Sequence, residues 1–240
     1  KDYFKIIKKY KSIKRNFWKY LMLKEFEKRL VSSIVLILTT FLVVLEGKIF
    51  FYIFLLLAFF ISSYEWLKMI KRVDIKILGI LFLFFSFYSA YYFRNQNLEG
   101  FLLIILICVS TDIGGYIFGN LFKGPKLSKI SPNKTQSGMI GSFVLSLITS
   151  SIFVLQYSSE IYIDQNLIEN DLKFVILILL ISSVSQVGDL IISYFKRSSK
   201  IKNTGNIIPG HGGLLDRIDG MIFVFPFVYL VTLISIIIKL

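Results

Sequence analysis

The sequence contains few of the residues that build cofactor sites in soluble proteins. Its 240 residues include one cysteine, Cys108, and one histidine, His211. A single cysteine excludes an intramolecular disulfide, and a lone histidine does not make a zinc site. The sequence has no Walker A motif and no dinucleotide-binding glycine fingerprint after a strand, which excludes the standard soluble nucleotide sites. We interpret Cys108, which lies in an apolar segment, as a small packing residue.

Acidic residues are also scarce, because 28 lysines and arginines stand against 15 aspartates and glutamates, and 55% of the chain is hydrophobic. An ordinary soluble domain does not have this composition. A segment of about 20 apolar residues is long enough to span a bilayer. The sequence predicts seven such spans: 30–46, 49–66, 77–93, 100–122, 138–157, 173–195 and 219–238. We therefore expect an all-α, polytopic integral membrane helix bundle with about seven transmembrane helices, in which residues 30–240 form a single transmembrane domain.

The positive charge is concentrated in alternate loops. Residues 1–29, 68–76, 123–134 and 196–217 hold 24 of the 28 lysines and arginines. The positive-inside rule places these segments, including the N-terminus, in the cytoplasm. Because the cations lie at membrane boundaries, the pattern argues against nucleic acid as a partner and for membrane lipids.

Residues 1–29 predict a basic amphipathic segment at the cytoplasmic membrane surface. Apolar residues recur there at helical spacing between positions 3 and 23, with lysines between them. A helix of this kind lies on an anionic membrane surface. A basic segment that only sets the topology is an equally good interpretation.

Two aspartates interrupt predicted spans. Asp112 lies near the middle of residues 100–122, and Asp189 lies near the cytoplasmic end of residues 173–195. A charged carboxylate at the centre of a spanning helix costs at least about 2.5 kcal/mol, so each needs a cavity, a partner or a metal ion. A structural ion pair is the alternative, but the polar residues that accumulate around both aspartates favour a functional site.

Four polar residues near the end of the sixth predicted span share one helical face. Asp189, Ser193, Lys196 and Arg197 follow i, i+4, i+7, i+8 spacing. This face leads from an intramembrane acid to two cytoplasmic cations, which suits a metal ion at one end and a phosphate at the other. Snorkelling at a helix end would explain the cations but not Asp189.

A glycine-rich loop, Pro-Gly-His-Gly-Gly at 209–213, precedes an Asp-Arg-Ile-Asp sequence at 216–219. Glycines let main-chain N–H groups approach an anion closely. If residues 214–219 begin the last helix, Asp216 and Asp219 share a face near its positive end. Paired carboxylates among lysines and arginines then favour a metal–polyphosphate site, whereas helix capping is the simpler explanation of the two acids alone. For His211 we predict a ligand contact or proton donation.

The loop after the fourth predicted span places lysines beside hydroxyl residues. It contains Ser131, Lys134 and Thr135 among further lysines. Phosphate binding and topology-setting charge are equally consistent with this composition.

These residues together resemble the phosphatidate cytidylyltransferases, also called CDP-diacylglycerol synthases. The family pattern is S-x-[apolar]-K-R-x4-K-D, a short spacer, and then [P/G]-x-H-G-G-[apolar]-x-D-R-[apolar]-D. The matching residues are Ser193, Phe195, Lys196, Arg197, Lys202, Gly205, Ile208, Pro209, His211, Gly212, Gly213, Leu214, Asp216, Arg217, Ile218 and Asp219. Asn203 stands where the family has aspartate.

Further motifs of the family are recognisable upstream of this pattern. Gly188-Asp189 is similar to its Gly-Asp pair, and Asp112 lies in a segment similar to its Asp-x-Gly segment. Ser-Pro-Asn-Lys-Thr at 131–135 is similar to its Ser-Pro-x-Lys-Thr motif, although Gln136 and Ser137 replace the usual tryptophan and glutamate.

The resemblance implies a reaction in which CTP and phosphatidic acid give CDP-diacylglycerol and pyrophosphate. It also implies Mg²⁺ or another divalent cation with room for a second cation, a homodimer, and a bacterial inner membrane with the active site facing the cytoplasm. The implied metal ligands are Asp189, Asp216 and Asp219, with Asp112 as a further candidate. The predicted catalytic residues are Lys196, Arg197, Lys202, His211, Asp216, Arg217 and Asp219. The predicted substrate-binding residues are Ser193, Gly212, Gly213, Ser131, Lys134 and Thr135.

Three other hypotheses stay open at the level of sequence. The first is a CTP-dependent transferase that acts on another lipid phosphate. The second is a lipid-binding membrane protein with a decayed site. The third is a transporter that uses Asp112 and Asp189, which does not explain why the cytoplasmic pattern is so complete.

Overall fold

The computed structural model describes residues 33–128, 131–157, 171–208, 210 and 212–239. Within them, five helices are long and apolar enough to cross a membrane. They are α2 (Lys48–Met69), α3 (Val73–Gln96), α4 (Leu98–Phe122), α5 (Gln136–Tyr157) and α7 (Asp171–Ser198). Shorter apolar helices at Ser33–Glu46 and in α9 (Met221–Lys239) occupy the first and last predicted spans. The all-α, polytopic membrane bundle is thus confirmed, while the segment 1–29 lies outside the described residues.

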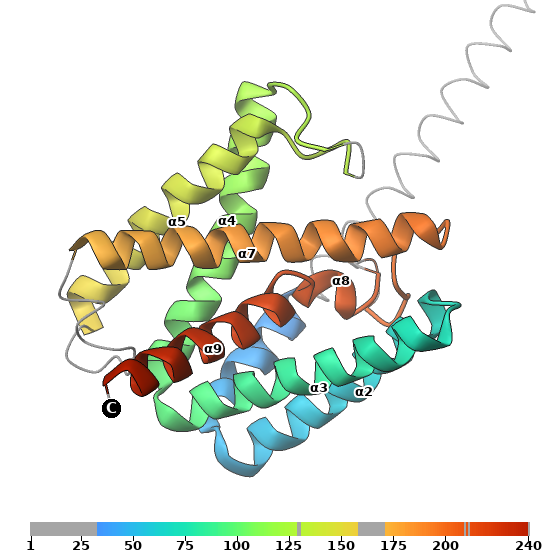
Figure 1. Cartoon of the computed structure of the whole chain (residues 1–240), viewed down its shortest axis with the longest axis horizontal. Coiled ribbons are helices and arrows are strands. Elements are labelled where there is room, and N and C mark those ends of the chain that lie inside the picture. Colours follow the sequence, from blue (N-terminus) through green and yellow to red (C-terminus); the bar gives the residue numbers. More distant parts are fainter. Residues whose placement is uncertain (1–32, 129–130, 158–170, 209, 211, 240) are drawn as a thin grey trace, which may run out of the picture.

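The helices pack around α7, which contacts α4, α5 and α9, while α3 contacts α2 and α9. Figure 1 shows α2, α3, α7 and α9 running in similar directions, with α4 crossing α7 steeply and α5 beside α4. One apolar core joins α4, α7 and α9 through residues such as Ile104, Ile178 and Val224. A second, smaller core contains Trp66, Ile192 and Leu215 and lies under the Lys/Arg-rich end of the bundle.

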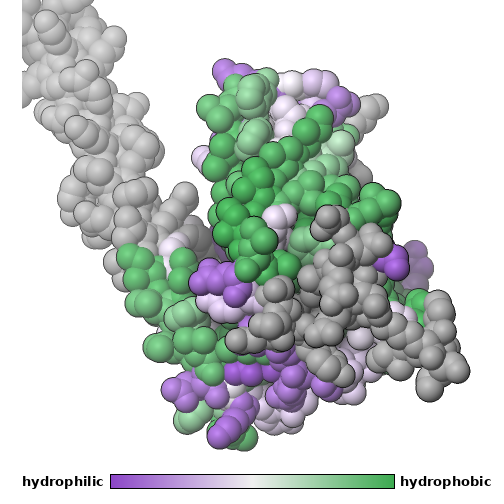
Figure 2. Space-filling view, turned by 90° about the vertical axis from the view of Figure 1, so that its left-hand side faces the viewer, coloured by the Kyte–Doolittle hydropathy of each residue, from purple (hydrophilic) through white to green (hydrophobic). Residues whose placement is uncertain are grey.

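Much of the outer surface of the bundle is hydrophobic. Large apolar side chains such as Leu81, Leu155 and Leu78 are 64%, 85% and 70% exposed, and Figure 2 shows hydrophobic residues covering much of one face. A soluble protein seldom leaves so much contiguous apolar surface in water. These side chains therefore face lipid in an integral membrane protein.

Residues 214–219 do not begin the last helix, so the condition under which Asp216 and Asp219 would share a face at its start is not met. Residues 215–218 form a separate single turn, α8 (Leu215–Ile218), Asp219 and Gly220 form a turn, and α9 begins at Met221. The break lies where the chain touches α7, because a Cβ on Gly220 would stand 2.4 Å from Ser185 Oγ. The acidic turn thereby lies against α7 instead of continuing α9.

Small residues set the distance between α4 and α5. A Cβ on Gly114 would lie 2.5 Å from the carbonyl oxygen of Gly141, whereas the nearest atom to a Cβ on Gly115 would be the side-chain hydroxyl of Ser142, at 2.9 Å, and the nearest backbone atom would be 3.9 Å away. Membrane helices pack through small residues because lipid gives no hydrophobic drive between them.

Gly114→Ala is expected to destabilise the protein, because the neighbouring backbone cannot rotate away as a side chain can. Overpacking costs about 1–3 kcal/mol, which corresponds to a fall of several degrees in the melting temperature of the detergent-solubilised protein. Gly115→Ala is the matched control and should lower it much less. Equal melting temperatures for the two variants would contradict this account of the α4–α5 contact.

Candidate active site

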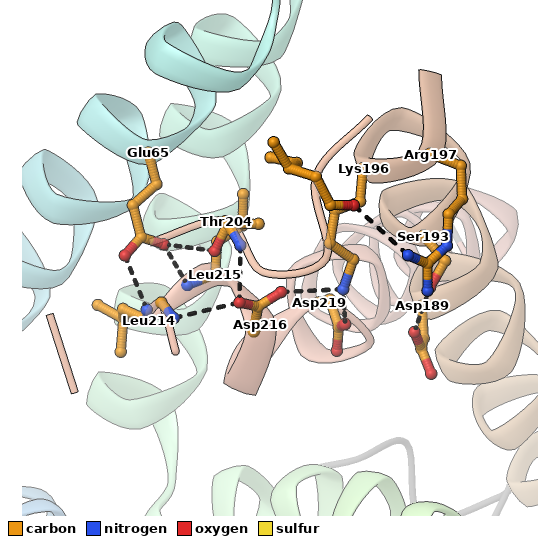
Figure 3. A network of polar contacts seen from close by, with 12 residues as sticks. Glu65, Asp189, Ser193, Lys196, Arg197, Thr204, Leu214, Leu215, Asp216 and Asp219 are labelled. Carbon is orange, nitrogen blue, oxygen red and sulfur yellow. Dashed lines mark hydrogen bonds and ion pairs between the residues drawn. The ribbon is translucent and has the colours of Figure 1, made fainter. Parts of the chain in front are cut away.

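The polar residues of the candidate site gather at the end of the bundle that carries the Lys/Arg-rich loops. They come from the last turns of α7, from the loop between Ser199 and Leu214, and from α8 (Figure 3). The loop that joins α4 to α5 and the last turns of α2 contribute one charged residue each. Segments far apart in the sequence therefore supply one network.

Asp216 lies at the centre of this network. Its Oδ1 accepts a hydrogen bond from Lys196 Nζ at 2.9 Å, and its Oδ2 accepts from the backbone N–H groups of Thr204 at 2.8 Å and Gly213 at 3.1 Å. The side chains of Lys196 and Asp216 are only 11% and 9% exposed. A carboxylate with three donors, one of which is a buried cation, has one fixed orientation, which a ligand for a metal ion needs.

Asp189 lies beside this centre on α7. Its Oδ1 accepts from Ser193 Oγ at 3.2 Å, the contact that i, i+4 spacing predicts, and its Oδ2 pairs with Lys134 Nζ at 2.5 Å. Lys134 comes from the loop between α4 and α5, which folds back on itself as Leu127 N–H donates to Lys134 O at 2.8 Å. Lys134, the cation of the Ser-Pro-Asn-Lys-Thr segment, thus forms an ion pair with Asp189.

Asp219 connects the two carboxylates. Lys196 Nζ lies 3.8 Å from its Oδ2, and its side chain is 14% exposed. Burial, followed by the negative charge of Asp189, raises the pKa of Asp219 well above its usual value. Two buried carboxyls this close do not both ionise readily, so a cation beside them would relieve their repulsion. Asp112, exposed on α4, is near enough to interact with the charges of Asp189 and Lys134.

The glycine loop binds the protein's own acids. Gly213 N–H donates to Asp216, as described, and Gly212 N–H donates to the carbonyl of Ile208 at 3.2 Å. Gly212 has a φ of 94°, a conformation that side chains rarely adopt. The contact of these N–H groups with a substrate anion stays a prediction; in the structure they donate to the acceptors just named. Their role here is to fix the turn that carries Asp216.

Other predicted residues lie at the edge of the network or outside it. Arg197, Lys202 and Arg217 are exposed, and Arg197 donates to the carbonyl of Ile201. Thr135 Oγ1 accepts from Gly138 N–H and so caps α5, while Ser131 O accepts from Lys134 N–H in a turn. His211 lies outside the described residues.

Asn203, the departure from the family pattern, lies next to Asp216. A Cβ on Gly212 would lie 3.3 Å from Asn203 Cβ and 3.1 Å from Asp216 Oδ2. The replacement therefore removes one negative charge from the immediate surroundings of the central acid.

The sequence analysis missed Glu65, which lies near the end of α2 and is 1% exposed. Its carboxylate accepts hydrogen bonds from Thr204 Oγ1 and from the N–H groups of Leu214 and Leu215. Figure 3 shows it on the opposite side of the loop from Lys196. The argument that identified Asp112 and Asp189, an acid within a predicted span, would have found it.

The described residues do not contain a preassembled cluster of three or more His, Cys, Asp or Glu side chains. Mg²⁺ does not require one, since it binds through one or two carboxylates, with substrate phosphates and water as further ligands. Asp189, Asp216 and Asp219 offer the right donor atoms, and Lys134 and Lys196 neutralise them in the structure. The donor set thus fits a hard divalent cation that arrives with a phosphate ligand.

Comparison with known proteins identifies the family. Residues 79–235 match the model of the Cytidylyltransferase family. The chain belongs to this family. The matched region includes every acid of the candidate site except Glu65, which precedes it.

Bacterial relatives agree with the family model. A phosphatidate cytidylyltransferase of Rickettsia bellii (strain RML369-C) is 30% identical over 207 residues, which cover 85% of this chain and 89% of the relative. That of Rickettsia typhi (strain ATCC VR-144 / Wilmington) is 32% identical over 82% of this chain and 88% of the relative. That of Bacillus subtilis (strain 168) is 39% identical over 158 residues, or 63% of this chain and 55% of the relative. The two Rickettsia relatives thus align with more than four fifths of this chain, and the Bacillus relative with a shorter part of it.

Proposed function

We propose that this protein is a phosphatidate cytidylyltransferase. The observation that carries the proposal is the pairing of three largely buried or partly buried acids with two lysines at the Lys/Arg-rich end of the membrane bundle. Family membership and the relatives named above support the same activity. The substrates are CTP and phosphatidic acid, and the products are CDP-diacylglycerol and pyrophosphate.

The chemistry requires little from the protein beyond placement and charge. An oxygen of the phosphatidate headgroup attacks the α-phosphorus of CTP, a new P–O bond forms, and the bond to the β-phosphate breaks as pyrophosphate leaves. The nucleophile is already anionic near neutral pH, so no strong base is needed. The main barrier is repulsion between two phosphate groups, which the cations beside Asp189 and Asp216 reduce.

A divalent cation, with Mg²⁺ as our proposal, would be held by Asp189, Asp216 and Asp219. When bound, it would neutralise phosphate oxygens and align the two reacting groups. Lys196 and Lys134 lie on the same carboxylates. Both amines would then be able to turn toward phosphate oxygens, which accept from lysine as readily as carboxylates do.

We place the site on the cytoplasmic side of a bacterial inner membrane. The loops that form it carry most of the lysines and arginines, which the positive-inside rule assigns to the cytoplasm, where CTP is available. The lipid tails stay between the spans, so only the headgroup enters the polar network. A homodimer and the absence of a nucleic-acid partner stay predictions.

An assay with several acceptors and nucleotides tests the proposal. Purified protein in mixed micelles is expected to form CDP-diacylglycerol from CTP and phosphatidic acid when MgCl₂ is present, and to lose this activity when EDTA removes the metal. Product formed only from a different lipid phosphate would favour the related transferase. Absence of both turnover and Mg²⁺-dependent CTP binding in isothermal titration would favour a decayed site and contradict the proposal.

A further inference from the structure

We propose that Glu65 is a positioning residue for the transfer reaction, although it lies on α2, far in sequence from the family motif. This inference rests on the proposed function. Glu65 holds the loop between Thr204 and Leu215, and that loop holds Asp216. Its role is thus to fix the orientation of an acid that it does not touch.

The first argument is that Glu65 binds both ends of the loop. Its Oε2 accepts from Thr204 Oγ1 at 2.9 Å and from Leu215 N–H at 2.9 Å, and its Oε1 accepts from Leu214 N–H at 3.0 Å. Thr204 lies ten and eleven residues before Leu214 and Leu215 in the sequence, and this carboxylate joins the two ends of the loop. A carboxylate that is 1% exposed is stabilised in the interior only by such donors. The acid and the loop therefore depend on each other.

The second argument is that Thr204 connects Glu65 directly to Asp216. The hydroxyl of Thr204 donates to Glu65, while its backbone N–H donates to Asp216 Oδ2 at 2.8 Å. Gly213 N–H donates to the same oxygen of Asp216, and the N–H of the next residue, Leu214, donates to Glu65. Movement of the loop away from Glu65 would remove both backbone donors from Asp216.

The third argument is steric. A Cβ on Gly205 would lie 2.6 Å from Glu65 Oε1, and a Cβ on Gly213 would lie 2.5 Å from Glu65 Oε2. The Glu65 carboxylate lies so close to the loop backbone that a side chain at position 205 or 213 would clash with it. Gly205 and Gly213, which have no side chain, leave room for it. The glycines and Glu65 form one packing unit.

The hydrogen-bond pattern requires a carboxylate at this position. Each oxygen of Glu65 faces a backbone N–H, which cannot act as an acceptor. A glutamine would place its NH₂ group against one of these N–H groups in either orientation, leaving two donors opposed and buried. Glu65→Gln, which preserves volume, is therefore expected to release the loop without creating a cavity.

The test compares Glu65→Gln and Thr204→Val with Glu46→Gln, which alters an exposed glutamate in a helix outside the network. Loss of a residue that orients a metal ligand lowers metal affinity or activity by about 10- to 100-fold. We expect Glu65→Gln to raise the Mg²⁺ concentration for half-maximal rate and to weaken Mg²⁺-dependent CTP binding in calorimetry by a factor in that range. The KM for phosphatidate should stay within about twofold. Thr204→Val should change the same quantities less, and Glu46→Gln should match the wild type.

Limited trypsin digestion reports the loop independently of activity. Lys200 and Lys202 are exposed, and we expect cleavage after them to be at least several-fold faster in Glu65→Gln. If Glu65→Gln lowers the rate of CDP-diacylglycerol formation but leaves the Mg²⁺ dependence, the CTP affinity and the rate of trypsin cleavage unchanged, the inference is overturned. That result would indicate only that less of the protein is folded. If Glu65→Gln fails to insert, wild-type behaviour of Thr204→Val in all three measurements would overturn it. Wild-type protein with neither turnover nor Mg²⁺-dependent CTP binding would refute the proposed function, while digestion would still decide whether Glu65 holds the loop.

Discussion

Replacing Asp216 by asparagine is expected to lower kcat/KM by at least about 100- to 1,000-fold, the range seen when one preorganised electrostatic contact is lost from an active site. The variant keeps the shape of the side chain but removes its charge. Its NH₂ group would face either Lys196 or the N–H groups of Thr204 and Gly213, all of which are donors. Both metal binding and the hydrogen-bond network would be impaired.

The measurement is CDP-diacylglycerol formation by purified protein at several MgCl₂ concentrations. Asp74→Asn is the matched control, because Asp74 pairs with Arg72 at an exposed site where the two side chains are 62% and 73% exposed. Exposed ion pairs of this kind contribute little to stability, and Asp74 lies outside the candidate site. The control should therefore retain wild-type activity. Full activity of Asp216→Asn, with a normal melting temperature, would refute the assignment of Asp216 as a metal ligand.

Replacing Lys196 by methionine is expected to have an effect of similar size, and to reduce stability as well. Lys196 Nζ lies 2.9 Å from Asp216 and 3.8 Å from Asp219, and its side chain is 11% exposed. Removing one partner of a buried pair leaves an uncompensated charge and costs about 3–5 kcal/mol. Activity would fall by about 100-fold or more because a phosphate-directed cation is also lost.

Activity assays and thermal unfolding in detergent measure the two effects separately. Lys71→Met removes a cation from an exposed position in the loop between α2 and α3 and serves as the control. If Lys196→Met lowers the melting temperature but leaves the kcat of the folded fraction unchanged, Lys196 is only structural. Excess MgCl₂ should partly restore stability, because a divalent cation would neutralise the same carboxylates.

The relation between Asp189 and Ser193 shows what local sequence determines. Helical periodicity fixes neighbours three and four residues apart, so spacing alone placed these residues together, and the structure has their hydrogen bond. Hydropathy likewise located the spans, since a bilayer requires a long apolar helix whatever its neighbours are. The ends of the helices differ from those of the predicted spans; for example, the predicted span 77–93 is part of a helix from Val73 to Gln96.

The sequence by itself thus determined the membrane bundle, the family motif and the contacts within α7. Tertiary structure decided that Lys134 binds Asp189, that Glu65 binds the glycine loop, and that the acidic turn stands apart from α9. Each of these depends on how separate helices pack, and Gly220, between the acidic turn and α9, leaves no room for a side chain against Ser185 of α7. No periodicity within a single segment encodes contacts between residues more than 50 or 100 positions apart. The scarce acids of the chain are therefore recognisable in the sequence one by one, whereas their partners are defined only by the packing of the bundle.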